Sequence, residues 1–258
     1  MPRSTLAASE TITKDDFLGG KVKVLQPKNG YRAGVDAVLL AASVQASAGQ
    51  NILELGLGVG TASLCLNARV SGLSLTGVEL QNSYAELARE NAVANDSDLT
   101  VIQADLRVLP VELRQIQFEH VIMNPPYFDR AAGASSDDPG RDIAMGGATD
   151  LAEWISVGAK RLLPKGYLTL IQRIERLPEV LGAAYGKLGS IVVRPIAPRM
   201  GRSPNLFLMQ ARHSGRAPFR LLSPLVMHKG GVHEGDFENY RSEVKAILRD
   251  GAHLGWDA

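Results

Sequence analysis

Residues 51–60 have the sequence NILELGLGVG, in which a short apolar strand runs directly into three alternating glycines. Glycines at such a junction let the chain turn sharply and let a ligand approach the backbone closely. A helical segment, Thr61 to Arg69, follows at once. A strand, a glycine loop and a helix N-terminus together form a nucleotide-type site in a doubly wound sheet. The stretch therefore predicts a Rossmann-like α/β fold with a ligand held at Gly56, Gly58 and Gly60; the alternative is a tight turn without a ligand.

The segments on the carboxyl side of this loop alternate between strands and helices. The expected strands are 51–55, 73–80, 99–104, 118–123, 167–172, 191–196 and 206–211, and the expected later helices are 83–94, 151–163, 177–188 and 237–248. This alternation predicts a mostly parallel seven-stranded sheet with helices on both faces. Only nine residues, 197–205, separate the last two strands, too few for a helical crossover. We therefore expect an antiparallel strand near one edge.

A smaller N-terminal segment precedes this core. Residues 21–25, KVKVL, alternate as a strand does, and residues 35–44 are apolar with an acid in the first turn, as in a helix. We expect residues 1–46 to form a strand and helix extension packed on the core, and residues 47–258 to form the core domain.

Composition narrows the class of protein. Hydrophobic residues are 45% and charged residues 21%, as in ordinary globular chains. No apolar run approaches the roughly 20 residues that cross a bilayer, and residues 1–10 lack the apolar centre of a signal peptide. The single Cys65 excludes an internal disulfide and a cysteine-built metal site. These features predict a cytoplasmic protein without a metal.

The spacing and charge of the glycine loop indicate which ligand it holds. Dinucleotide sites use Gly-x-Gly-x-x-Gly, whereas the glycines here follow Gly-x-Gly-x-Gly. Glu54, directly before the loop, would repel a phosphate but suits a cation. S-adenosylmethionine carries a sulfonium and an ammonium group, so the sequence favours it over a dinucleotide.

Acids also end the next two strands. Glu79-Leu80 follows the second strand, where a carboxylate is placed to accept hydrogen bonds from ribose hydroxyls, and Asp105-Leu106 follows the third, where it can accept from an adenine amino group. For each acid alone, a helix cap or a solvated carboxylate is the alternative interpretation. Their place at successive strand ends favours a shared site, because ligands bind at the carboxyl ends of parallel strands.

The fourth strand of this series runs into Asn124-Pro125-Pro126-Tyr127. The exocyclic amine of adenine is a poor nucleophile because its lone pair is delocalised into the ring. The side-chain oxygen of Asn124 and the carbonyl of Pro125 can accept hydrogen bonds from it, and the two prolines fix these acceptors in advance. Tyr127 offers a face for a flipped base. A rigid strand-exit turn is the alternative.

Together these residues resemble the class I S-adenosylmethionine-dependent methyltransferases that act on planar amines, over roughly residues 51–210. Residues 26–40, QPKNGYRAGVDAVLL, resemble more specifically the segment before the core of the bacterial valine-tRNA adenine-N6 methyltransferases. That resemblance implies that Tyr31, Arg32 and Asp36 line the methionine end of the cofactor. The NPPY turn is less specific, because release-factor glutamine methyltransferases and DNA adenine methyltransferases share it.

The net charge of +1 hides a strong segregation of charge. Residues 180–233 contain no Asp or Glu and carry Lys187, Arg194, Arg199, Arg202, Arg212, Arg216, Arg220 and Lys229, whereas the rest of the chain has a net charge of −7. Such a protein can present a basic face to nucleic acid at near-neutral net charge. The alternative is that these arginines fill ordinary surface positions.

We therefore expect an enzyme that methylates the N6 amine of adenine in RNA, with tRNA as the favoured substrate and the basic stretch 187–229 as the RNA contact. Two alternatives remain: a protein glutamine-N5 methyltransferase, and a non-catalytic RNA-binding module of the same fold. The loop 128–149 lies next to the expected site, as a lid or clamp or as a plain surface loop. The sequence predicts no oligomeric state.

Overall fold

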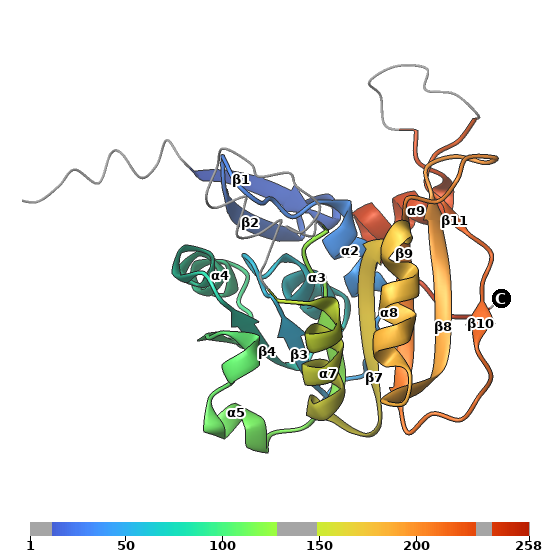
Figure 1. Cartoon of the computed structure of the whole chain (residues 1–258). Coiled ribbons are helices and arrows are strands. Elements are labelled where there is room, and N and C mark those ends of the chain that lie inside the picture. The colour runs from blue at the N-terminus through green and yellow to red at the C-terminus, as the bar shows by residue number, and fades with distance from the viewer. Residues whose placement is uncertain (1–11, 128–148, 231–238, 258) are drawn as a thin grey trace, which may run out of the picture.

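A nine-stranded sheet lies at the centre of the computed structural model, which describes residues 12–127, 149–230 and 239–257 (Figure 1). Its order across the sheet is β10-β8-β9-β7-β6-β3-β4-β5, with β11 also paired to β8. Only β9 runs antiparallel to its neighbours, β7 and β8. The strands are β3 (Asn51–Leu55), β4 (Ser74–Glu79), β5 (Leu99–Gln103), β6 (Phe118–Met123), β7 (Leu162–Arg173), β8 (Leu188–Ala197), β9 (Leu206–His213), β10 (Arg220–Leu221) and β11 (Leu225–Val226).

The doubly wound sheet with an antiparallel strand near one edge is confirmed. The sheet has nine strands rather than seven, because the two-residue strands β10 and β11 are too short to show an alternating pattern. The expected helix 237–248 is also shorter. Helix α9 covers Ser242–Lys245 and continues as one π-helical turn, Ala246–Asp250, since Tyr240 pairs with His228 in a β-bridge instead.

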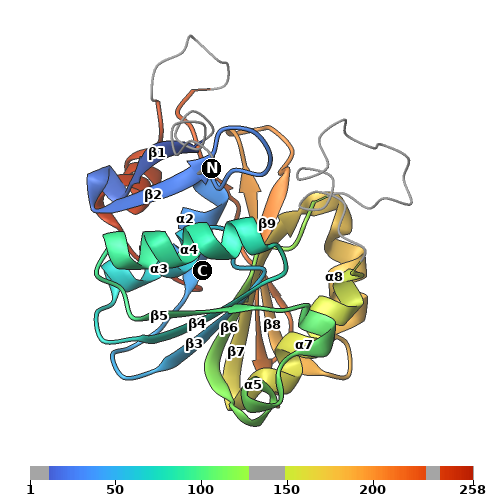
Figure 2. The same ribbon diagram turned by 90° about the vertical axis from the view of Figure 1, so that its left-hand side faces the viewer.

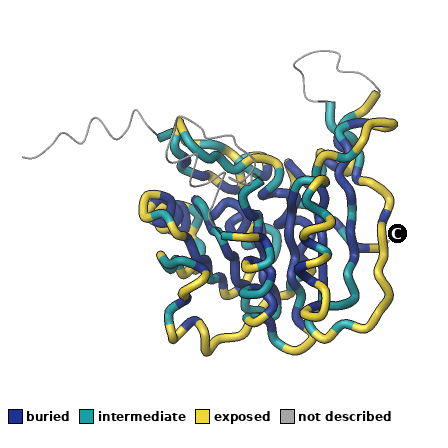
Figure 3. Tube along the Cα trace, in the orientation of Figure 1, coloured by how far each residue is buried: buried dark blue, intermediate teal, exposed yellow. Residues whose placement is uncertain are grey.

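Helices cover both faces of the sheet (Figure 2). One layer contains α2 (Val35–Ser43), α3 (Thr61–Arg69) and α4 (Asn82–Ala94), and the other contains α5 (Val111–Gln115), α7 (Leu151–Arg161) and α8 (Leu177–Ala184). Successive strand residues point to opposite layers, so Ile52 packs in the first and Leu53 in the second. Most residues of the central strands are therefore buried between the two helix layers (Figure 3). Among the described residues, no helix has the length and apolarity needed to cross a membrane.

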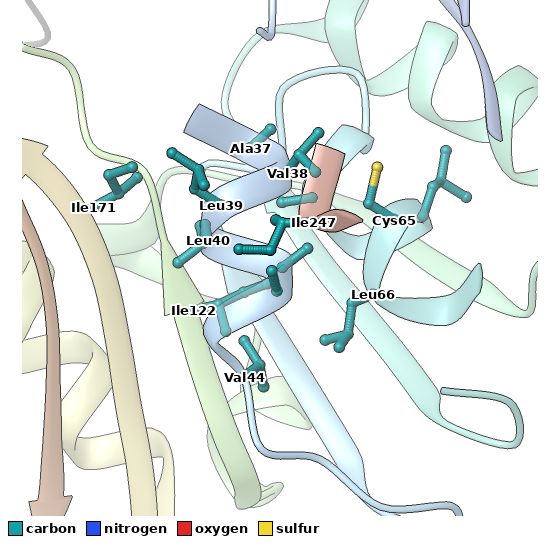
Figure 4. Packing of buried hydrophobic residues seen from close by; sticks show 14 of the residues in the cluster. Ala37, Val38, Leu39, Leu40, Val44, Cys65, Leu66, Ile122, Ile171 and Ile247 are labelled. Carbon is teal, nitrogen blue, oxygen red and sulfur yellow. The ribbon is translucent and has the colours of Figure 1, made fainter. Parts of the chain in front are cut away.

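Helix α2 is part of the core rather than an attachment to it. Residues 37–43 are all buried, and Leu39 and Leu40 lie beside Ile122 of β6 and Ile171 of β7 (Figure 4). The C-terminal tail is bonded to the end of the helix, because the Trp256 indole donates to the Ser43 carbonyl at 2.7 Å. The division of the chain at residue 46 stays a prediction.

A separate antiparallel hairpin, β1 (Ile12–Phe17) and β2 (Val22–Pro27), lies against α4. The side chain of Asn91, fully buried, accepts from Leu25 N at 2.7 Å and donates to Leu25 O at 3.0 Å. One turn later Asn95 accepts from Lys23 N at 2.9 Å and donates to Lys23 O at 2.8 Å. Two asparagines thus act as a partner strand for β2. Strand β1 was not predicted, because its sequence ITKDDF shows little apolar alternation.

Removing the Asn91 amide should destabilise the protein, because the same Nδ2 also donates to Val59 O of the glycine loop at 3.0 Å. We expect Asn91→Ala to lower the free energy of unfolding by about 2 to 4 kcal/mol, since it leaves three backbone groups without their partner. Urea unfolding would measure this. The control is Asn82→Ala, which removes an exposed asparagine of the same helix; equal losses for the two variants would contradict this account of hairpin docking.

Candidate active site

The predicted glycine loop lies at the carboxyl edge of the sheet, where the chain order reverses between β3 and β6. Gly60 begins α3 with a φ of 88°, in the left-handed region that glycine favours. Gly56 lies against Trp154 of α7, so closely that a β-carbon there would be 2.5 Å from the indole. The buried ring of Trp154 therefore supports the loop, and only glycine fits at position 56.

Glu79, at the end of β4, is bonded to this loop. One carboxylate oxygen accepts from Gly58 N at 2.8 Å and the other accepts from Gln81 N at 2.8 Å. Burial raises the pKa of the Glu79 carboxyl, while these backbone donors oppose the shift. The acid thus fixes the position of the glycine loop relative to β4, and each oxygen keeps a second lone pair for a ligand hydroxyl.

Glu54, the acid before the loop, is fully enclosed by the protein. Its Oε2 accepts from the Ser63 hydroxyl at 2.5 Å and from Ser63 N at 3.0 Å. Burial raises the pKa of Glu54 to about 8, although the bonds from Ser63 oppose the shift. Glu54 therefore joins β3 to the first turn of α3.

The Asn124 amide is held by the N-terminal segment. Its Nδ2 donates to the Tyr31 hydroxyl oxygen at 3.3 Å, and Tyr31 is held in turn by Tyr84 of α4, whose hydroxyl accepts from Tyr31 N at 2.9 Å. The remaining atom, Asn124 Oδ1, is buried and has no hydrogen-bond partner in the described part of the chain. An unpaired buried acceptor costs free energy until a donor reaches it, so this oxygen is free to accept a hydrogen bond from a ligand.

The two prolines of the turn are fixed by a residue that the sequence analysis did not identify. Gln172, buried on β7, donates from Nε2 to Pro125 O at 3.2 Å and, more distantly, to Pro126 O at 3.4 Å. Arg176 NH1 also donates to Pro126 O at 3.4 Å. The available signal was a glutamine at the carboxyl end of an otherwise apolar strand beside β6. Pro125 O keeps a second lone pair for a further donor.

Tyr127 and Asp36 join the catalytic turn to α2. The Tyr127 hydroxyl donates to Asp36 Oδ2. Burial raises the pKa of the Asp36 carboxyl, and the Tyr127 bond and the charge of Arg173 oppose that shift. The positive charge of Arg173, at the end of β7, also opposes the rise that burial causes in the pKa of Tyr127. Arg173 was not predicted, because it lies outside the motifs and before the acid-free stretch that begins at residue 180.

The electrostatics of this edge fit a cationic ligand. Burial raises the pKa of the Tyr31 hydroxyl, and the charges of Asp36, Glu54 and Glu79 raise it further. Three carboxyl groups from α2, β3 and β4 therefore act on one position beside Asn124. Together with the glycine loop, they form a site whose charge suits the sulfonium and ammonium groups of S-adenosylmethionine.

Two other predicted cofactor residues have different surroundings. Arg32 binds the hairpin, with NH2 on Asp15 at 2.6 Å and NH1 on Thr13 Oγ1 at 2.6 Å, so its cofactor contact stays a prediction. Asp105 caps a 3-10 turn (Leu106–Val108). The Arg107 guanidinium donates to the Asp105 carboxylate and holds its pKa below the usual range.

Two apolar positions flank these acids. Leu80 is 53% exposed at the end of β4, which leaves an apolar surface open beside Glu79, whereas Leu106 is buried next to Asp105.

The basic stretch does not share one face. Arg194 and Arg220 donate to carbonyls of the C-terminal tail, and the buried Arg199 donates to Lys229 O. Two further cations are exposed at the carboxyl edge of the sheet, namely Arg202 and Lys229. Three others lie at the opposite edge, namely Lys187, Arg212 and Arg216. The reason is that β8 and β9 run in opposite directions and carry their cations to both edges of the sheet. The role of the stretch 187–229 as the RNA contact stays a prediction. Residues 128–148 of the loop and His233 lie outside the described residues.

Comparisons with known proteins agree on one family. The model of the methyltransferase small domain matches residues 32–192. The tRNA1(Val) (adenine(37)-N6)-methyltransferase of Cronobacter sakazakii is 29% identical over 82% of this chain and 81% of its own length. Its namesake in Shewanella baltica is 31% identical over 71% of this chain and 78% of its own length.

Solved structures show the same fold. A predicted O-methyltransferase from Agrobacterium tumefaciens has a TM-score of 0.70 at 26% identity and covers 86% of this chain and 100% of its own. The Thermus thermophilus 16S rRNA N2 G1207 methyltransferase, solved with AdoMet and guanosine, has a TM-score of 0.55 at 18% identity. It covers 78% of this chain and 50% of its own.

The raised pKa of Glu54 should appear in the pH dependence of stability. Burial shifts its folded-state pKa from 4.5 to about 8, so the folded chain holds this proton more tightly than the unfolded chain does. The contribution of this proton to the free energy of unfolding is complete below about pH 4.5. It falls as the pH rises from 4.5 and is lost once the pH has passed through about 8. Relative to Glu54→Gln, the wild type should lose up to about 1.4 kcal/mol of unfolding free energy per pH unit in this range.

Chemical unfolding at pH 5, 6.5 and 8 would measure the difference. The control is Glu90→Gln, which removes an exposed carboxyl on α4. Parallel pH curves for wild type and Glu54→Gln would show that burial does not hold this proton.

Proposed function

Since this chain belongs to the methyltransferase small domain family, we propose that it transfers a methyl group from S-adenosylmethionine to the N6 amine of an adenine in RNA, with tRNA as the substrate class. The observation that carries this proposal is the buried, unpartnered Oδ1 of Asn124. This oxygen directly follows β6 and can accept a hydrogen bond from a donor such as an exocyclic amine. The names of the relatives in Cronobacter and Shewanella support the choice of adenine and of tRNA.

S-adenosylmethionine is the methyl donor of this enzyme, and when bound it supplies a methyl group activated by the positive sulfur. We assign its binding to the loop at Gly56, Gly58 and Gly60, with Glu79 accepting from the ribose hydroxyls. Asp105 would accept a hydrogen bond from the adenine amino group of the cofactor. The bound cofactor would also cover the exposed side chain of Leu80. Tyr31, Arg32 and Asp36 would form the methionine end, together with Glu54. Because burial raises the pKa of Glu54 to about 8, the bound cation would have to lower that pKa before this carboxyl could balance its charge.

Asn124 and Pro125 would orient the amine of the target base. With Nδ2 occupied by Tyr31, Asn124 presents its oxygen, and Gln172 fixes the Pro125 carbonyl. Two acceptors then hold the two N–H bonds, which favours the pyramidal amine with an available lone pair. Since both acceptors are in place before the base arrives, they reorganise little during the reaction. Positioning for an in-line displacement supplies most of the remaining rate.

Tyr127 would stack on the base, and Asp36 would hold the ring in place. Stacking on an aromatic side chain stabilises a bound base by about 1–3 kcal/mol. Because the hydroxyl donates to Asp36, the ring position is linked to α2, which is packed in the core.

Asn124→Ala tests the catalytic assignment directly. We expect methylation of bulk bacterial tRNA to fall at least about 100-fold, since an oriented acceptor of the reacting group is lost. The dissociation constant for S-adenosylmethionine, measured by calorimetry, should stay within about twofold. Asn82→Ala serves as the control. Methylation at the wild-type rate by Asn124→Ala would contradict the assignment.

The acceptor is tested by incubating the wild type with labelled S-adenosylmethionine and either total RNA or release factors. Label in N6-methyladenine supports the proposal. Label in a glutamine side chain would replace it with protein amide methylation, and absence of S-adenosylmethionine binding would leave an RNA-binding module.

Two variants at Tyr127 separate the hydroxyl from the ring. Tyr127→Phe keeps the stacking face and loses the bond to Asp36, so we expect kcat/KM for tRNA to fall about tenfold or less. Tyr127→Ala also loses stacking and should fall a further fivefold to about 100-fold. Steady-state kinetics would measure both. Equal activity in the two variants would mean that the ring does not contact the base.

A further inference from the structure

Seven cations and no acid lie on the segments of β7, β8 and β9 that reach the edge of the sheet opposite the NPPY turn. Three segments meet there: residues 160–167 at the start of β7, 185–191 at the start of β8, and 211–220 after β9. Their cations are Lys160, Arg161, Lys165, Lys187, Arg212, Arg216 and Arg220. In Figure 1 the connections that contain these segments lie at the bottom of the molecule, and the hairpin β1–β2 lies at the top.

Strand pairing brings the three segments together. Arg212 of β9 pairs with Tyr167 of β7 on one side and with Gly189 of β8 on the other. Gly215, which follows β9, also lies against Gly189, so closely that a β-carbon at Gly189 would be 2.1 Å from Gly215 O. The turn that carries Arg216 is therefore packed directly on the start of β8, two residues after Lys187.

Several of these side chains are available to a partner. Lys165, Lys187 and Arg216 are exposed, and the Arg212 guanidinium lies 5.3 Å above the centre of the Tyr167 ring. Tyr185, at the end of α8, is 87% exposed. We call Lys165, Tyr185, Lys187, Arg212 and Arg216 the basal surface.

Four of the seven cations also donate hydrogen bonds within the protein. Lys187 Nζ donates to the Ala183 carbonyl at 2.8 Å, and Arg212 Nε donates to the Lys165 carbonyl at 3.1 Å. Arg161 donates to the Leu113 carbonyl at 3.3 Å and Arg220 donates to the Trp256 carbonyl at 3.1 Å. The acid on the neighbouring strand, Glu119 of β6, accepts from Asn51 N of β3 at 2.9 Å. Its carboxylate is thus directed away from β7, and no acid of the three segments offsets the basal cations.

We propose that the basal surface binds the phosphate backbone of the RNA substrate at a distance from the methylated base. This inference rests on the proposed function and adds a second contact region to it. Eight residues of β7 separate Lys165 from Arg173, which at about 3.3 Å per residue is about 26 Å. A folded RNA can span that length, whereas the target nucleotide alone cannot.

The chemistry of the surface fits a polyanion with exposed bases. Lysine and arginine neutralise phosphates and release their counterions, and no carboxylate of the three segments repels the backbone. The exposed Tyr185 ring among the cations offers a stacking face for an unpaired base. The contact would position the RNA and raise its affinity, while Asn124 and Tyr127 act on the base.

The test compares two double variants that each remove two exposed cations. Lys187→Ala/Arg216→Ala changes the basal surface, and Arg89→Ala/Lys245→Ala changes exposed cations on α4 and α9. The pairs are matched, because Lys187 and Arg89 each also donate to a main-chain carbonyl. The probe is bulk bacterial tRNA, assayed for methylation and for binding at several salt concentrations.

The basal variant should raise the KM for tRNA about threefold to tenfold and leave kcat and the affinity for S-adenosylmethionine unchanged. Its slope of log affinity against log salt should fall by about 1 to 2, and the control variant should match the wild type. If the wild type methylates tRNA and both variants bind it equally well, the basal surface is not an RNA contact and the proposed function stands. If the wild type neither binds nor methylates tRNA, the proposed function fails and this inference fails with it.

Discussion

The bond from Asn124 Nδ2 to the Tyr31 hydroxyl is the interaction on which the proposed chemistry depends. An amide that donates with its nitrogen to a fixed partner presents its oxygen in a fixed direction, and here that oxygen is buried and unpartnered among the described residues. Tyr31 can serve as the partner because Tyr84 holds its backbone. In the proposed mechanism, the N-terminal segment would therefore contribute to catalysis by orienting Asn124 at the sheet edge, without contacting the substrate itself.

The same segment carries much of the charge of the site. Asp36 of α2 acts on Tyr31 together with Glu54 and Glu79, so carboxyl groups from three elements converge on one position. Burial of these groups is costly and raises the pKa of each of them, and at Asp36 the charge of Arg173 only partly opposes the shift. A cationic cofactor would offset this cost. In the proposed function, the buried acids would bind the cofactor and the cations at the ends of β8 and β9 would bind the RNA, so the two tasks would fall to different parts of the sheet.

The sequence predicted the parts of the site that a local pattern specifies. The glycine loop, Glu79 and the NPPY turn lie at one edge, because strand ends in a parallel sheet must meet there. Gln172, Arg173 and Asn91 were missed, since their partners are between 32 and 137 residues away in the chain and leave no local pattern. Arg32 shows the opposite limit, since it was predicted from a motif to contact the cofactor, whereas its observed partners belong to the hairpin. The basic stretch was counted along the chain, and an antiparallel strand divided its charges between two edges.

The central claim is that this edge methylates the N6 amine of adenine in RNA. Its most direct test is mass spectrometry of nucleosides from the tRNA of bacterial cells that lack this protein, complemented either with the wild type or with the Asn124→Ala variant at equal abundance. The account predicts N6-methyladenosine at one tRNA position with the wild type and its loss with the variant. Identical nucleoside profiles in the two strains would contradict it.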